Sequence, residues 1–451
     1  MKLKKFDYKL PREERKKKKR IMLILTSVVV CLVITLASSY AYYQSIELQN
    51  PYNTKVGEFD SGDIIFAITI DGESSSTFPA KGTEYIVESV TCDKGATGVW
   101  NNGTWDVRVI GLLETKTTCN VEFISESGTL AYKVLQQYGG KEAINEAPAN
   151  TFASGSTATT NIMYKVEDDY GTSYYYRGAK DLLNNNLIFA GFQWKIVRIN
   201  GDGSIRLIYN GTEEQFNSNG TMNTTGIDTQ IGNSQFNANT TNAGFVGYMF
   251  RSSSNFFDPQ PNTSISAIMR FIDNWYANSM VTKGSDVTEK IADNLFCNDR
   301  MLGSTNMNDI NYALGARLRG NVVSVWPRLM CAQKNDRFTV SDVNVGNGAL
   351  TYPVGLITAD EVALAGGRNN TNNTSYYLYT NRNFWSMSPI GYYVTYQGSK
   401  GAMAYNVDAD GKLNDESGVS TTMGVRPVIN LRSNTQATGS GSATDPFVVI
   451  S

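Results

Sequence analysis

The chain has no histidine among its 451 residues. Without an imidazole it has no Ser-His-Asp or Cys-His catalytic site, no His-ligated zinc and no imidazole proton shuttle. Most of the common hydrolytic mechanisms are therefore excluded. Among the few mechanisms that stay open to an enzyme is a pair of carboxylates, as in glycosidases.

Cysteine is scarce as well, with five in the chain, and Cys31 lies inside a long uncharged segment. In an oxidising compartment the other four most simply form two disulfides, for which three pairings exist. We predict the local pairing, which joins Cys92 to Cys119 and Cys297 to Cys331. Neither pair has the CxxC spacing of a metal knuckle or a redox site, so a structural role is favoured.

Charge is missing from residues 21–43, which directly follow a basic segment, residues 1–20. At ~1.5 Å per residue, a helix of this length covers about 34 Å, enough for a hydrocarbon core of about 30 Å. The basic segment has eleven Lys and Arg against three acidic residues, and positive flanks stay in the cytoplasm. We predict a cytoplasmic segment 1–20, a single transmembrane helix 21–43 and an extracellular remainder in the cell membrane.

The alternative is a cleaved secretory signal, with Ser39 and Ala41 as the small residues before the cut. The apolar run is longer than the core of a signal peptide, which favours the anchor. A mature chain released into the medium with Tyr42 at its N-terminus would contradict the anchor.

The residues after the predicted anchor include 29 basic and 39 acidic side chains, a formal charge of −10. An acidic exterior argues against nucleic acid as a partner. The basic segment suits anionic lipid head groups on the cytoplasmic side.

Composition and patterning divide the exterior into four predicted parts. They are a polar stalk 44–60, a disulfide-stapled β module 61–125, a helical linker 126–160 and a mixed domain 161–451. The predicted fold class is α+β, with the transmembrane helix followed by the antiparallel module and the mixed domain. In the module, short runs rich in β-branched and aromatic residues alternate with turn clusters, and Trp100 and Trp105 are expected in its aromatic core.

Three local patterns are specific. Alternation on both sides of Asn200–Gly203, in GFQWKIVRI and SIRLIYNG, predicts a β-hairpin. SISAIMRFIDNWYANSMV has apolar residues at i, i+3 and i+4 and predicts an amphipathic helix. Thr358 and Glu361 form a capping-box pattern before VALAGG, which predicts a second helix.

The C-terminal order TADEVALAG, NFWSMSP, AYNVDADGKL, MGVRPVINL and DPFVVI resembles C-type-lectin-like domains of the class that includes the formylglycine-generating-enzyme fold. The hairpin and the Cys92/Cys119 module are similar to segments of membrane-anchored Firmicutes surface proteins. This resemblance implies a disulfide-braced scaffold whose loops display a binding face. The enzymatic branch uses cysteines in its C-terminal half, and no cysteine follows Cys331, so formylglycine chemistry is not implied.

Residues 369–405 are rich in Asn, Tyr, Ser and Gly, the composition of adaptable binding loops. Exposed aromatic rings there would stack on sugars or anchor a protein ligand. The predicted ligand-binding residues are Tyr376, Tyr377, Tyr379, Trp385, Tyr392, Tyr393 and Tyr396. The alternative is that ordinary strand alternation and a compositional bias explain them.

A candidate calcium loop begins at Asn406, with Asp408 and Asp410 at alternating ligand positions and Gly411 at the turn. Ser417 stands where an EF-hand has a bidentate Glu. An ordinary hairpin turn also explains Asp410-Gly411, and apart from calcium no cofactor is expected.

Five carboxylates are the candidates for an acid and base pair, although no spacing singles out two of them. They are Asp273, Asp299, Asp336, Asp360 and Glu361. The sequence favours a non-catalytic surface protein that binds a glycan or protein ligand. The alternatives are a structural envelope protein without a discrete ligand and a carboxylate-dependent glycan hydrolase.

Overall fold

The computed structural model describes residues 64–450 with short gaps. The gaps are residues 82, 102–103, 112–115, 149–153, 215, 223–224, 242, 251–261, 302–311, 314, 322–326 and 395–399. The predicted cytoplasmic segment 1–20, transmembrane helix 21–43 and stalk 44–60 lie outside the described residues. Within the described part, no helix has the length and apolar character needed to span a bilayer.

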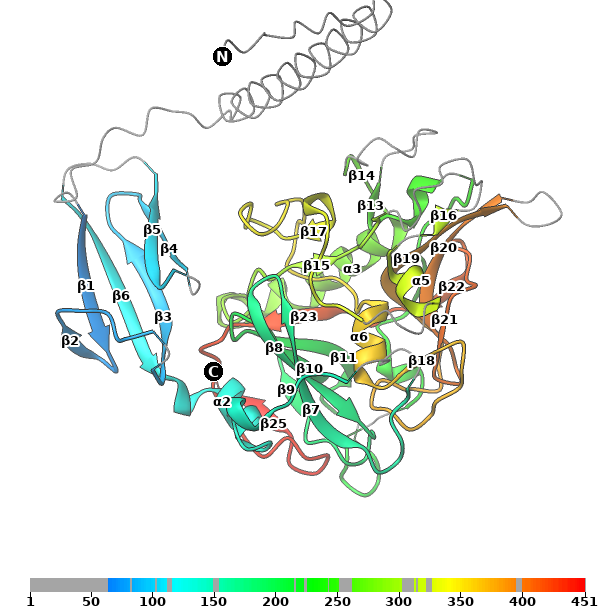
Figure 1. The fold of residues 1–451 in the computed structure, drawn as a ribbon, viewed down its shortest axis with the longest axis horizontal. Helices are drawn as coiled ribbons and strands as arrows, with labels where there is room; N and C mark the ends of the chain where they lie inside the picture. The colour runs from blue at the N-terminus through cyan, green and yellow to red at the C-terminus, as the bar shows by residue number, and fades with distance from the viewer. Residues whose placement is uncertain are drawn as a thin grey trace, which may run out of the picture. The chain divides into compact units, whose positions relative to one another are not determined.

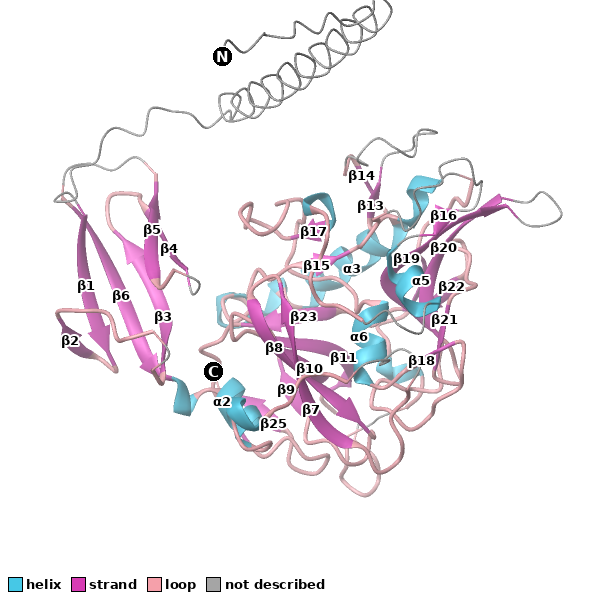
Figure 2. Ribbon diagram, viewed as in Figure 1, coloured by secondary structure: helices cyan, strands magenta, loops and turns pink. Residues whose placement is uncertain are grey.

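The α+β fold class predicted from the sequence is wrong, because the described residues are mostly β (Figure 2). They form 25 strands and five α-helices, the longest of 13 residues. Many of the strands are only two to four residues long. Such strands form through backbone pairing to a neighbour, so they leave no hydrophobic alternation in the sequence.

The β module consists of a four-stranded sheet in the order β2-β1-β6-β3 and a separate hairpin, β4-β5. The strands are β1 (Ile64–Ile70), β2 (Glu73–Ser75), β3 (Tyr85–Cys92), β4 (Thr97–Asn101), β5 (Asp106–Ile110) and β6 (Thr117–Ser125). Cys92 and Cys119 are register partners on β3 and β6 and form a disulfide. This part of the predicted pairing is confirmed.

Aromatic side chains fill the core of the module. Phe123 is fully buried on β6, and the rings of Phe78, Trp100 and Trp105 pack against it at centroid distances of 5.8, 5.3 and 6.3 Å. The indole N–H of Trp105 donates to the Pro79 carbonyl at 2.7 Å. The two tryptophans therefore form the aromatic core predicted for this module.

An eight-stranded sheet forms one side of the larger domain, with the central order β23-β11-β10-β9-β25-β24 and β8 and β7 joined at β10. Its strands are β7 (Asn161–Asp168), β8 (Gly171–Gly178), β9 (Asn186–Phe189), β10 (Phe192–Ile199), β11 (Ile205–Thr212), β23 (Val428–Leu431), β24 (Ala437–Thr438) and β25 (Phe447–Val449). The predicted hairpin is confirmed as β10 and β11, with Ile199 opposite Ile205.

A seven-stranded sheet has the order β12-β22-β19-β20-β21-β18, with β16 paired to β19. Its strands are β12 (Asn233–Gln235), β16 (Tyr312–Ala313), β18 (Arg368–Asn369), β19 (Phe384–Val394), β20 (Lys400–Val407), β21 (Lys412–Asn414) and β22 (Thr422–Gly424). Two small ladders pair β13 (Met249–Phe250) with β14 (Ser264–Ile265) and β15 (Phe296–Cys297) with β17 (Arg337–Phe338).

The described helices are short and capped. They are α2 (Leu130–Gln136), α3 (Ala267–Ser279), α4 (Ser285–Thr288), α5 (Gly315–Asn321) and α6 (Ala359–Ala365). Helix α3 begins after Ser266, whose side chain accepts from the Met269 N–H, and α6 has the capping box of Thr358 and Glu361. Both were predicted from the sequence. Helix α6 contacts β8 of one sheet and β19 and β21 of the other (Figure 1).

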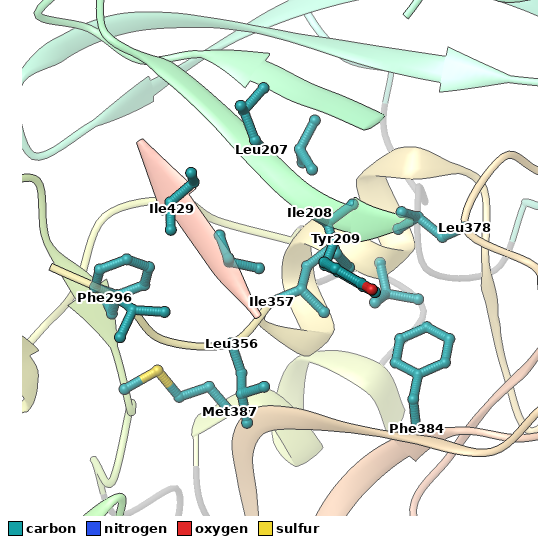
Figure 3. Close-up of a cluster of buried hydrophobic side chains, with 14 of the residues drawn as sticks. Leu207, Ile208, Tyr209, Phe296, Leu356, Ile357, Leu378, Phe384, Met387 and Ile429 are labelled. Carbon is teal, nitrogen blue, oxygen red and sulfur yellow. The ribbon is translucent and has the colours of Figure 1, made fainter. Parts of the chain in front are cut away.

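The inner faces of the two sheets meet in one hydrophobic core (Figure 3). Leu207, Ile208 and Tyr209 of β11 lie on one side of it, and Phe384 and Met387 of β19 lie on the other. Because helix α6 starts beside this core, the first turn of α6 is fixed by both sheets.

Candidate functional site

Most of the aromatic residues predicted to bind a ligand lie inside the protein. Tyr376, Tyr377, Trp385 and Tyr392 are buried, with exposed fractions of 0, 1, 0 and 9%. Tyr379 is half-buried. The side chain of Tyr393, and Tyr396 altogether, lie outside the described residues.

The exposure predicted for Tyr376, Tyr377 and Tyr392 is therefore wrong. The Trp385 indole N–H donates to the Ser234 carbonyl at 3.0 Å, and the Tyr392 hydroxyl donates to the Thr241 carbonyl at 2.9 Å. These rings fill the core beside β19 and anchor the segment around β12 to it. Part of the Asn- and Tyr-rich stretch 369–405 forms β19, a central strand of its sheet. Its side chains are buried because the opposing sheet covers them.

The candidate calcium loop is the turn between β20 and β21. Asp408 Oδ1 accepts from the backbone N–H groups of Asp410 and Lys412, both at 3.0 Å, and its Oδ2 lies 3.3 Å from the Lys412 ammonium. Asn406 is buried and accepts from the Ser417 hydroxyl at 2.7 Å. These contacts are those of a hairpin turn, and the calcium site stays an untested prediction.

Three of the five candidate carboxylates, Asp299, Asp360 and Glu361, line one pocket together with four arginines. Asp336 instead pairs with Arg300, and Asp273 lies on α3. The arginines are Arg198, Arg206, Arg319 and Arg328. The pocket also has the apolar side chains Leu295, Leu329 and Met330 at its wall.

Glu361 at the start of α6 bridges two arginines of the β10–β11 hairpin. Arg198 Nε donates to Glu361 Oε1 at 3.1 Å, and Arg206 Nε lies 2.5 Å from the same oxygen. Arg198 also donates from Nη1 to Asp168 at 2.6 Å. The other oxygen of Glu361 accepts the Thr358 N–H at 2.9 Å, so the capping box holds the carboxylate in place.

Asp360, next in the same turn, is held from three directions. Arg319 donates to its two oxygens from Nε and Nη2, both at 2.7 Å, and the Arg328 backbone N–H donates to Oδ1 at 2.9 Å. Arg319 Nη2 also donates to Asp299 at 2.5 Å. Both carboxylate oxygens of Asp360 therefore have donors.

Arg328 is the arginine of the pocket whose guanidinium N–H donors are not all used in hydrogen bonds within the described residues. Its Nη2 makes a long contact of 3.4 Å to Asp299, and its Nε is buried without a hydrogen-bond partner among the described residues. The side chain is 35% exposed, beside the largely exposed Met330 at the edge of the pocket. A guanidinium has five N–H donors, so Arg328 can still bind an acceptor that arrives from solvent.

The Cys297–Cys331 disulfide joins the two segments that carry this part of the pocket. Cys297 precedes Asp299 by two residues, and Cys331 follows Arg328 by three. The bridge therefore fixes the distance between the carboxylate and the arginine. The second predicted pairing is confirmed, and two disulfides indicate an oxidising, extracytoplasmic environment for the folded part.

Burial and neighbouring charges decide the ionisation of the pocket. Burial lowers the pKa of Arg206 to about 10, with Glu361 opposing the shift. Burial alone would raise the pKa of Glu361, but Arg206 and Arg198 outweigh it and hold that pKa below its ordinary value. For Arg319 burial is likewise outweighed, by Asp360 and Asp299, and the pKa is raised.

Four cationic and three anionic side chains therefore line a cavity of about 20 Å³. That volume holds roughly one water-sized group. One anionic oxygen or a small acidic group fits at the mouth, whereas a whole sugar ring must lie across the surface.

Sequence reasoning named the three carboxylates but missed all four arginines. Arg198 and Arg206 stand within the apolar runs FQWKIVRI and SIRLIY. A charged residue in a strand of this kind needs a buried counter-charge, and this signal was available. Arg319 and Arg328 follow no comparable pattern.

The chain matches no protein family, no curated protein and no solved structure. The resemblance to C-type-lectin-like domains therefore stays a prediction.

Proposed function

We propose that the chain is a membrane-anchored extracellular binding protein that recognises an acidic group on a surface glycan or protein ligand. The uncharged segment 21–43 behind a basic segment supports the anchor, and the two disulfides support the outside location. The resemblance to display domains supports a binding role. The pocket beside α6 supplies the recognition site.

Arg328 is the observation that carries the proposal. Its side chain lines the pocket and is 35% exposed, and its Nε has no hydrogen-bond partner among the described residues. Arg319 beside it is paired with two carboxylates, Asp299 and Asp360. An incoming carboxylate or phosphate oxygen gains a charge-assisted hydrogen bond there, and such bonds contribute about 1.5–3 kcal/mol.

The contacts of the three carboxylates favour binding over proton transfer. Glu361 has a lowered pKa and is held by two arginines, which does not suit a general acid. Burial raises the pKa of Asp273 to about 6, but Asp273 is not among the residues that line the pocket. A glycan hydrolase is therefore the weaker alternative.

The test is calorimetric titration of the full chain, in mild detergent, with glucuronate and with glucose. The two sugars differ in the acidic group, so saturable binding of glucuronate alone is expected. Arg328→Gln should weaken it by about 10- to 100-fold, the equivalent of one charge-assisted hydrogen bond. The control is Arg382→Gln, since Arg382 is an exposed arginine outside the pocket lining.

Four results would contradict the proposal. Equal binding of glucose and glucuronate would show that the acidic group is not recognised. Unchanged binding of glucuronate by Arg328→Gln would show that the pocket is not the binding site. If neither glucuronate nor inorganic phosphate binds saturably, the alternative of a structural envelope protein is favoured. Release of cleaved sugar from a polymer would favour the hydrolase.

A further inference from the structure

Lys195 and Asn186 form a buried polar pair on neighbouring strands. They are register partners on β10 and β9, and both side chains have an exposed fraction of 0%. The Lys195 ammonium or amine Nζ donates to Asn186 Oδ1. Residues directly opposite on antiparallel strands have side chains on the same face, so this contact follows from the register.

The hairpin turn between the two strands fixes that register. Ala190 and Gly191 have φ values of 54° and 75°, the left-handed conformations of a type I′ turn. Such a turn matches the twist of the strands and leaves two loop residues. Lys195 and Asn186 therefore cannot slip past each other without breaking the turn.

Lys195 has no buried counter-charge. Among the described residues no ion pair includes it, and its hydrogen-bond partner is a neutral amide. A buried ammonium without a carboxylate is costly, which favours the neutral amine. In agreement, burial followed by the positive charge of Arg426 lowers the pKa of Lys195 to about 7.

Asn186 presents its carbonyl side to the amine. Its Nδ2 donates to the Gly441 carbonyl at 2.8 Å, and its backbone N–H donates to the same oxygen at 3.0 Å. Because the Gly441 carbonyl can only accept, Nδ2 faces Gly441 and Oδ1 faces Lys195. The amide carbon is thus held beside a nucleophilic nitrogen inside the core.

We propose that Lys195 and Asn186 join in an intramolecular amide bond between β10 and β9. The Nζ lone pair attacks Cγ of Asn186, and an N–C bond forms. The Cγ–Nδ2 bond then breaks, and Nδ2 leaves as ammonia with one proton taken from Nζ. Neither an oxidant nor a reductant is consumed, and the charge of Arg426 favours the oxyanion that forms during the attack.

This cross-link would lock β9 to β10, the strand that carries Arg198 of the pocket. Strand β10 carries Lys195 and, three residues later, Arg198 of the pocket. The inference is independent of ligand binding, because the pair lies inside the sheet and is not part of the pocket lining.

Tryptic mapping of the intact chain tests it directly. Trypsin cuts after Lys180, Lys195 and Arg198, so an unmodified chain yields residues 181–195 and 196–198. Trypsin does not cleave after a cross-linked Lys195. We therefore expect one peptide, 181–198, whose mass is lower than that of the linear 181–198 sequence by the mass of one ammonia. Fragmentation should give no ions from cuts between Asn186 and Lys195, because that stretch is closed into a ring.

The control is Lys195→Met, which keeps an apolar stem and removes the nucleophile. Trypsin should release residues 181–198 of this variant as one peptide, with the mass calculated from its sequence and without the loss of ammonia. Loss of ammonia through a succinimide at another asparagine would leave Lys195 cleavable, and so it is distinguished by the same map. A wild-type chain with both disulfides intact that yields only peptides 181–195 and 196–198 at full mass overturns the proposal, whether or not the variant folds.

Discussion

Arg198 and Arg206 lie directly opposite each other on β10 and β11. Two like charges in this arrangement are destabilising unless an opposite charge lies between them. Glu361 accepts from both guanidinium groups and at the same time caps helix α6. One carboxylate therefore couples the central hairpin of one sheet to the helix that contacts both sheets.

Glu361→Gln should destabilise the folded chain by about 3–5 kcal/mol at neutral pH. The substitution leaves two buried arginines short of a counter-charge, which is the costly way to break a buried ion pair. Urea unfolding followed by fluorescence measures the difference. Glu416→Gln is the matched control because Glu416 is exposed, and an equal loss in both variants would contradict the role of Glu361.

The difference in unfolding free energy between the wild type and Glu361→Gln should depend on pH. The pKa of Glu361 is lower in the folded chain than its ordinary value of 4.5. Its stabilising contribution is therefore complete above about pH 4.5 and is lost as the pH falls through the folded pKa. The free-energy gap between wild type and Glu361→Gln should stay constant from pH 7 to about 5 and narrow below that, and a gap that widens in acid would refute the assignment.

The two disulfides should differ in their effect on ligand binding. Replacing Cys297 and Cys331 by serine frees Arg328 from Asp299, so the affinity for glucuronate should fall together with stability. Replacing Cys92 and Cys119 by serine should destabilise the β module by about 2–5 kcal/mol and leave the affinity unchanged. Calorimetry of the two double variants makes the comparison, and equal affinities would argue against bracing of the pocket by Cys297–Cys331.

Gly355→Ala should disturb the packing of the Phe296 ring that lies against Arg206. A Cβ at this position would lie 2.5 Å from Cδ1 of Phe296, whose ring packs 4.8 Å from the Arg206 guanidinium. Overpacking of this kind costs about 1–3 kcal/mol. At Gly418 a Cβ meets nothing within 4 Å, so Gly418→Ala should be close to neutral, and thermal unfolding of the two variants tests the contrast.

Local features of this protein were predictable from its sequence, and long-range ones were not. The β10–β11 hairpin, the caps of α3 and α6 and both disulfides follow from residues close together in the chain. The pocket depends on pairs such as Arg198 with Glu361, which are 163 residues apart. No spacing rule connects such residues before the fold is known.

The burial of the tyrosines could not be predicted from the sequence either. A Tyr-rich and Asn-rich composition is typical of binding loops, and it predicted an exposed face around Tyr376 and Tyr392. Whether such a strand is exposed depends on what packs over it, and here the opposite sheet covers it. Composition gives the chemistry of a segment but not its neighbours.

The Cys297–Cys331 bridge also closes a covalent ring that contains Asp299, Arg319 and Arg328 of the pocket. The entropic cost of closing a loop grows only slowly with its length, and both ends of this one are fixed by the bridge. A few residues inserted into this ring, outside α5 and away from Asp299 and Arg328, should therefore cost little stability through chain entropy, because the bridge keeps the separation of the two ends.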